Sequence, residues 1–150
     1  MIWLLRIVCV IIASSIGFLF ASILHTQAVL AKLSDIEIKI TFAQRIQTTW
    51  QDMLGLAPTY GLIILVALTI AFSVSGLLRK KWNIAPKFIY PLAGGIAFLT
   101  MLLAMQPILN VTLLAGARGI SGLLMQVCAG LIAGICFAHL IERANKSKHA

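Results

Sequence analysis

Charged residues are scarce in this 150-residue chain, and acidic ones are the scarcest, with four Asp or Glu against twelve Lys or Arg. Charged residues make up 11% of the sequence, whereas a soluble domain carries about 25%. Four stretches, at residues 7–31, 53–78, 88–117 and 119–141, contain no Asp, Glu, Lys or Arg. Catalytic, transport and ion-coupling sites inside membranes are normally built from such residues. The composition therefore excludes an ordinary soluble domain and argues against an intramembrane site of this kind.

Residues that ligate metals or haem are also few, with three Cys and three His. His25 and His139 fall at opposite ends of their apolar stretches, whereas a bis-His haem needs two imidazoles at one depth. Cys128 and Cys136 are about 80° apart around a helix of 3.6 residues per turn, so they form no metal pair. No disulfide framework is expected. The sequence predicts no catalytic, cofactor-binding or metal-binding residue.

What the chain has instead is apolar sequence, at 61% of all residues. Each uncharged stretch is long enough to cross a hydrocarbon core of ~30 Å, which takes ~20 helical residues. We predict an all-α polytopic membrane protein with a single domain, residues 1–150, of four antiparallel spans at about 2–24, 57–78, 88–109 and 119–141. The first helix can continue outside the membrane to Leu33. We expect it to stay in the protein, because its apolar run exceeds the roughly 7–15 residues of a signal peptide.

The distribution of basic residues predicts the orientation of these spans. With a cytoplasmic N-terminus, the inside set is Arg6, Arg79, Lys80, Lys81, Lys87, Arg143, Lys146 and Lys148, and the outside set is Lys32, Lys39, Arg45 and Arg118. Because cytoplasmic loops carry an excess of Lys and Arg, we expect both termini to be cytoplasmic. The basic inner face would then suit anionic lipid headgroups.

Small residues recur every four positions in three of the spans. The first span has Ala13, Gly17 and Ala21, the second has Ala67, Ala71 and Ser75, and the fourth has Gly122, Gly130 and Gly134 with Gln126 between them. Small residues on one face let helix backbones approach closely in lipid, so we expect these faces to be packing seams. Gln126 is expected to make an interhelical hydrogen bond worth roughly 1 kcal/mol.

The outer loop, residues 25–56, contains an amphipathic helix. Its apolar residues fall at helical spacing, at Phe42, Ile46, Trp50, Met53 and Leu54. Thr41 is the expected N-cap and Gly55 the expected end. Two interpretations stay open: a helix lying on the outer leaflet, or a docking surface for a partner, with these side chains as the contact residues. Arg118, just before the fourth span, is either an outer-interface anchor or a contact for an anion or lipid headgroup.

The segment Arg45-Ile-Gln-Thr-Thr-Trp-Gln-Asp-Met-Leu-Gly-Leu-Ala-Pro-Thr-Tyr60, together with the four-span layout, resembles a group of small bacterial inner-membrane proteins that have no assigned activity. The resemblance implies a bacterial inner membrane. It implies no activity, cofactor or site residue, but it makes Asp52 and residues 57–60 the first place to look for a functional site.

The sequence favours a non-enzymatic scaffold or accessory subunit, because intramembrane chemistry is scarce and the outer amphipathic segment offers a contact surface. The expected partners are membrane lipids and either a membrane protein or a second copy of the chain. Nucleic acid is not expected, since the basic residues lie beside span ends. The alternative is a small transporter or channel formed by oligomerisation, which would require Gln126, Thr100 and Ser73 to converge around water.

Overall fold

The computed structural model describes residues 2–34, 41–109 and 120–146, and this part of the chain is helical almost throughout. The helices are α1 (Ile2–Ser34), α2 (Phe42–Leu56), a single π-helical turn η1 (Ala57–Gly61), α3 (Leu62–Trp82), α4 (Pro86–Leu109) and α5 (Ile120–Lys146). Four of the helical segments are long and apolar enough to cross a membrane. The prediction of an all-α, four-helix membrane protein is confirmed.

The outer amphipathic helix begins where the sequence predicts it. Thr41 caps α2 in a reciprocal arrangement, in which the Gln44 amide N–H points to the Thr41 hydroxyl and the Gln44 side chain accepts from the Thr41 backbone. The predicted end at Gly55 is wrong, because the chain stays helical through Leu56 into η1. A glycine inside a helix costs only about 1 kcal/mol relative to alanine, and Pro58 lies in the first residues of η1, where a missing N–H is tolerated.

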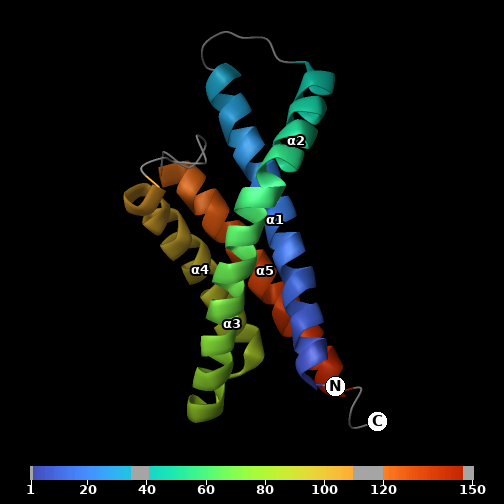
Figure 1. Cartoon of the computed structure of the whole chain (residues 1–150), viewed down its shortest axis with the longest axis vertical. Coiled ribbons are helices and arrows are strands. Elements are labelled where there is room, and N and C mark those ends of the chain that lie inside the picture. The colour runs from blue at the N-terminus through green and yellow to red at the C-terminus, as the bar shows by residue number, and fades with distance from the viewer. Residues whose placement is uncertain (1, 35–40, 110–119, 147–150) are drawn as a thin grey trace.

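Two of the helical segments are much longer than a membrane is thick. The continuous run Phe42–Trp82 has 41 residues, or ~60 Å at 1.5 Å per residue, and the 33 residues of α1 make ~50 Å. The end of α1 and α2 therefore extend beyond α4 and α5 as a pair of helices (Figure 1), and we call α2 together with residues 19–34 of α1 the α1–α2 arm. Instead of branching off sideways, α2 continues the course of α3.

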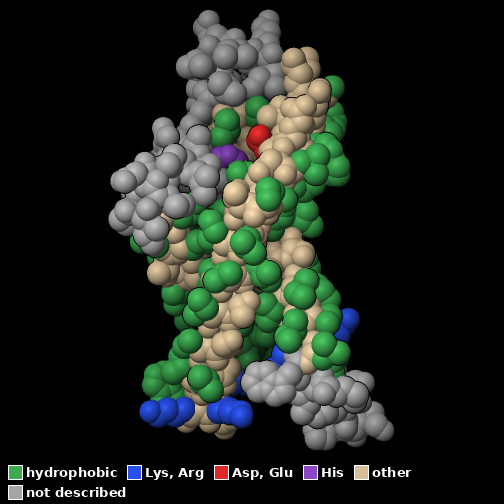
Figure 2. All heavy atoms as spheres, viewed as in Figure 1, with side chains coloured by type: hydrophobic (Ala, Val, Ile, Leu, Met, Phe, Trp, Pro, Cys, Tyr) green, Lys and Arg blue, Asp and Glu red, His purple; other side chains and the backbone are tan. Residues whose placement is uncertain are grey.

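The opposite end of the molecule carries the basic residues. Arg79, Lys80 and Lys81 occupy the last turn of α3, where positive charge is favourable next to the free carbonyls. Asn83 then adopts a left-handed conformation (φ 52°) that ends α3, and Pro86 begins α4. The start of α1 and the end of α5 lie at this end of the molecule (Figure 1), and Lys and Arg side chains gather there on the face shown in Figure 2. Arg79, Lys80 and Lys81, which the orientation prediction assigns to the cytoplasmic side, thus lie together at one end of the molecule.

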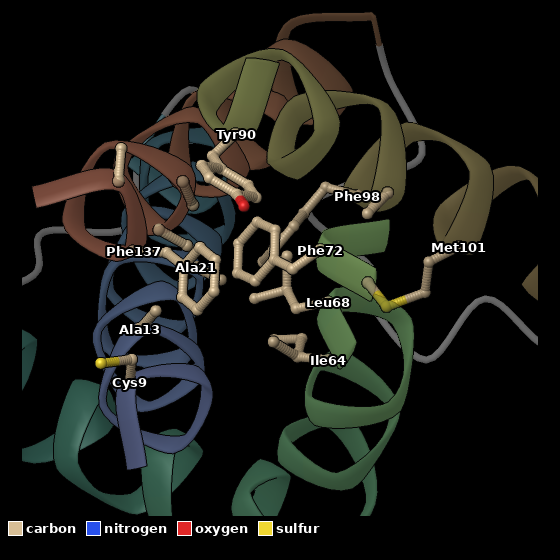
Figure 3. Close-up of a cluster of buried hydrophobic side chains, with 14 of the residues drawn as sticks. Cys9, Ala13, Ala21, Ile64, Leu68, Phe72, Tyr90, Phe98, Met101 and Phe137 are labelled. Carbon is tan, nitrogen blue, oxygen red and sulfur yellow. The ribbon is translucent and has the colours of Figure 1, made fainter. Parts of the chain in front are cut away.

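An aromatic cluster joins α3, α4 and α5. Phe72 stacks on Phe137 with ring centroids 4.3 Å apart and planes 9° from parallel. Tyr90 meets both rings edge to face, at 5.9 Å from Phe72 and 4.8 Å from Phe137. Figure 3 shows the three rings between these helices, with Leu68 and Ile64 continuing the buried row along α3. Such pairs add about 0.5–1.5 kcal/mol each beyond the area they bury.

Candidate functional site

The glycine stripe of the fourth span lies against α4. A methyl group added at Gly130 would fall within 3 Å of the backbone of Gly94, and one added at Gly134 would overlap with the backbone of Tyr90 and Pro91. Gly122, one turn before Gln126, is buried as well. The backbones of α4 and α5 are therefore in direct contact, and only glycine fits at these crossings.

The small stripe of α1 lies against a different side of α5. Ala13 and Ala21 are fully buried, and a methyl group at Gly17 would come 2.9 Å from the Cβ atom of Ala133. The structure thus brings together the predicted packing residues of the first and fourth spans. It places α5 between α4 and α1.

The corresponding stripe of α3 is only partly covered, with Ser75 buried and Ala67 and Ala71 half-buried against the core. Ala67, Ala71 and Ser75 line an open apolar groove of about 900 Å³ between α3 and α4, and no other helix of the described residues fills it.

Gln126 connects three elements through its side-chain amide. Its Nε2 donates to the backbone carbonyl of Ala21 in α1 at 2.9 Å, and its Oε1 accepts from the hydroxyl of Tyr60 in η1 at 3.0 Å. Gln126 is 1% exposed and Tyr60 is fully buried. Two polar side chains that would be costly alone in an apolar interior therefore satisfy one another.

A second polar layer lies further along α1, where α2 crosses it. The Thr26 hydroxyl is 3.0 Å from the Asp52 carboxylate and 3.1 Å from the Ser22 carbonyl. Since this hydroxyl has one proton, it donates to one acceptor at a time. Further out, Arg45 Nη1 donates to the Gln27 side-chain oxygen at 3.3 Å. These hydrogen bonds fasten α2 to α1.

His25, near the end of the first apolar stretch, belongs to the same layer. Its side chain is only 8% exposed and lies within electrostatic range of Asp52. Ser22, fully buried one turn earlier, lies on the same side of α1. Sequence reasoning missed this group, although the four-residue spacing of Ser22 and Thr26 and the emphasis on Asp52 were signals that pointed to it.

The described residues offer no metal-binding set, since no three His, Cys, Asp or Glu side chains among them are grouped to hold an ion. Cys9 is buried, Cys136 is partly buried and Cys128 is exposed. The polar layers can hold helices in register.

The predicted contact residues of α2 line a groove in the α1–α2 arm. The groove measures about 470 Å³ and is bounded by Leu19, Ile23 and Gln27 of α1 and by Phe42, Arg45, Ile46, Thr49, Trp50 and Met53 of α2. Phe42 is 78% exposed, and Ile46 and Trp50 are more than half exposed. Arg118, the remaining predicted contact, lies outside the described residues.

Comparisons with protein-family models, with curated proteins and with solved structures find no match to this chain. The candidate site is therefore defined by the geometry above: the α1–α2 arm, its groove and the polar layers that fasten it to the bundle.

Proposed function

We propose that the protein is a non-enzymatic scaffold or accessory subunit that docks a membrane-protein partner through the α1–α2 arm. The observation that carries this proposal is the exposed row Phe42, Ile46, Trp50 and Leu54, at 78%, 57%, 58% and 58% exposure. Large apolar side chains that stay exposed outside a bilayer mark contact sites, and tryptophan is enriched where binding energy concentrates.

The position of this row relative to the membrane supports the proposal. Counting ~20 residues from Arg79 along α3 reaches the level of Tyr60, and counting ~20 from Arg6 along α1 reaches Thr26, which lies beside Asp52. The outer boundary of the hydrocarbon then falls between these two levels. The part of α2 that precedes Asp52 lies beyond that boundary, where lipid chains do not cover its apolar face.

The same proposal places the chain in a bacterial inner membrane with both termini in the cytoplasm. The grouping of Arg79, Lys80 and Lys81 at the end that also carries the start of α1 and the end of α5 supports this orientation. The α1–α2 arm would then stand on the outer side. Exposed residues of the spans such as Leu62, Val66 and Ile70 would face lipid.

The competing transporter or channel function needs a polar path through the membrane. Ser73 and Thr100 are exposed on the outside of the bundle, and each hydroxyl donates to the carbonyl four residues earlier on its own helix, at 2.7 and 2.6 Å. Gln126 is buried between α1, η1 and α5 instead. This arrangement favours the scaffold over a pore.

Photo-crosslinking in the native membrane tests the proposal. With p-benzoylphenylalanine in place of Trp50, we expect discrete protein adducts. The same crosslinker in place of Ile70, an equally exposed apolar residue in the middle of α3, should give lipid adducts. Mass spectrometry of the protein purified with its native lipids should show the same partner as a stoichiometric subunit.

Two outcomes would overturn the assignment. One is a crosslinking pattern at position 50 that matches the pattern at position 70. The other is a purified monomer without a partner that supports solute flux in liposomes above the level of empty vesicles.

A further inference from the structure

With the membrane placed as in the proposed function, the groove in the α1–α2 arm crosses the outer boundary of the hydrocarbon. Its inner end is formed by Leu19, Ile23 and Met53, near the level of the polar layers, and its outer end by Phe42 and Arg45. An occupant that fills its length must be apolar on the membrane side and remain in contact several turns beyond the hydrocarbon. That describes a helix that leaves the bilayer as a continuous rod, as α3 and α2 themselves do.

A lipid chain fits this shape less well. To lie along Ile46 and Phe42 it would have to leave the hydrocarbon for a groove whose rim residues are themselves more than half exposed. The lipid chain would leave the hydrocarbon, where it is fully surrounded by apolar groups, for a groove that covers it only in part. A helix that already extends outside the membrane gains buried apolar surface by covering this face.

The charge of Arg45 distinguishes between a partner protein and a second copy of this chain as the occupant of the groove. Arg45 is the one charged residue among those lining the groove, and its described hydrogen-bond partner is the neutral Gln27 amide. Two copies in the same membrane orientation, related by a two-fold axis along the membrane normal, would bring identical levels of α2 together. Arg45 would then face Arg45. An acidic side chain at that level satisfies the guanidinium instead.

We infer that the groove takes a transmembrane helix of a different protein, one that continues outward past the bilayer and carries an Asp or Glu about two turns beyond it, opposite Arg45. This inference rests on the proposed function and names the chemistry of the partner. Trp50 and Phe42 supply the aromatic contacts at the groove rim, and Arg45 supplies the selectivity.

Two synthetic helices test the inference on the full chain in nanodiscs. Each has a spanning segment of ~20 Leu and Ala residues followed by a helical extension, with a single Glu or a single Lys in the second turn outside the membrane. A p-benzoylphenylalanine in place of Gln47, an exposed residue that does not line the groove, reports binding as crosslinking yield against peptide concentration. We expect the Glu peptide to bind about tenfold more tightly than the Lys peptide.

Charge variants make the result specific to Arg45. Arg45→Glu should invert the preference between the two peptides, and Arg45→Gln should remove it. Both variants should change thermal unfolding only slightly, because they remove one partly exposed hydrogen bond to Gln27. Equal binding of the two peptides, or no binding of either, would overturn the inference. So would a crosslink between two copies of the chain at position 47, or a co-purified phospholipid that is lost on Ile46→Gln.

These failures are distinct from failure of the proposed function. If the peptides do not discriminate but the crosslinker at position 50 still captures a stoichiometric subunit in the native membrane, the scaffold stands and the acidic helix is wrong. If neither experiment finds protein at the groove, both proposals fail.

Discussion

The α4–α5 pair and the α1–α2 arm are both antiparallel helix pairs of one chain, yet they are held together in opposite ways. Between α4 and α5 the backbones are in direct contact at Gly94, Gly130 and Gly134. Between α1 and α2 the helices are joined by hydrogen bonds, from Thr26 to Asp52 and from Arg45 to Gln27. The apolar face of α2 is left open beside these bonds.

The contrast follows from the surroundings of each pair. Lipid gives helices no hydrophobic reason to associate, so a pair inside the membrane depends on close van der Waals contact, which glycine allows. In water, apolar faces associate because this reduces their exposed area, so a large exposed apolar face marks a contact site for another surface. The α4–α5 pair is complete within the chain, whereas under the proposed function the α1–α2 arm is complete only with a partner surface on it.

The largest effect should come from a methyl group in the α4–α5 contact. Gly130→Ala places Cβ within 3 Å of the Gly94 backbone. Because the backbone cannot move aside unless α4 and α5 separate, we expect a loss of about 3 kcal/mol in the free energy of unfolding. Gly55→Ala is the matched control, because a methyl group there meets nothing within 4 Å. It should stabilise α2 by about 0.5–1 kcal/mol. Reversible unfolding in mixed micelles measures both, and similar shifts would mean that α4 and α5 do not touch.

The next effect concerns the amide that joins α1, η1 and α5. Gln126→Leu should lower stability by about 1–2 kcal/mol, because it leaves the buried Tyr60 hydroxyl without its acceptor. Tyr60→Phe should cost less, since the amide keeps its bond to the Ala21 carbonyl. The double variant should be more stable than the sum of the two losses predicts. Strict additivity would show that the two side chains do not interact.

A smaller effect on stability, but a clear effect on geometry, is expected in the arm. Thr26→Val removes the hydroxyl that bonds to Asp52 while keeping the shape, so α2 should separate from α1 with a loss of less than about 1 kcal/mol in global stability. Spin labels at Ala31 and Gln47, both exposed, should report a broader and longer distance distribution. Thr26→Ser retains the donor and should keep the original distribution. An unchanged distribution in the valine variant would mean that packing alone holds the arm.

The smallest effect is expected at the exposed row of α2. Ile46→Gln should change the thermal stability of the isolated protein by less than about 0.5 kcal/mol, because Ile46 is 57% exposed. The same substitution at Ile64, which is fully buried on α3, should prevent stable folding. A large loss at position 46 in the isolated protein would show that this face is already covered, and the contrast between the two helix pairs would disappear.

The fold was largely predictable because it follows from local features. Uncharged runs of sufficient length define spans wherever they occur, and the Thr41 cap is read from residues three positions apart. The glycine stripe of the fourth span is likewise a matter of spacing within one helix. The continuation of α2 through Gly55 was missed because the penalty for one glycine is smaller than the gain from a helix that extends across it.

The candidate site was predictable only in part, because it depends on which helices are neighbours. The sequence around Gln126 does not indicate that its hydrogen-bond partner is Tyr60, which lies 66 residues earlier in the chain. His25 reads as an interfacial residue until α2 is placed beside it. Periodicity on α2 identified Phe42, Ile46, Trp50 and Met53, but the contributions of Arg45, Thr49 and the α1 wall emerge only from the tertiary arrangement.

The π-helical turn at Ala57–Gly61 determines the direction in which the arm presents its apolar face. Such a turn holds about one residue more than an α-helical turn, and each residue of an α-helix advances the azimuth by roughly 100°. Everything in α2 is therefore rotated about the common axis relative to α3 by this local widening. If all five residues of the turn adopted α-helical geometry instead, Phe42, Ile46 and Trp50 would move to another side of the rod without altering their spacing. The rotation of α2 relative to α3 about their common axis is therefore set by the five residues of this turn.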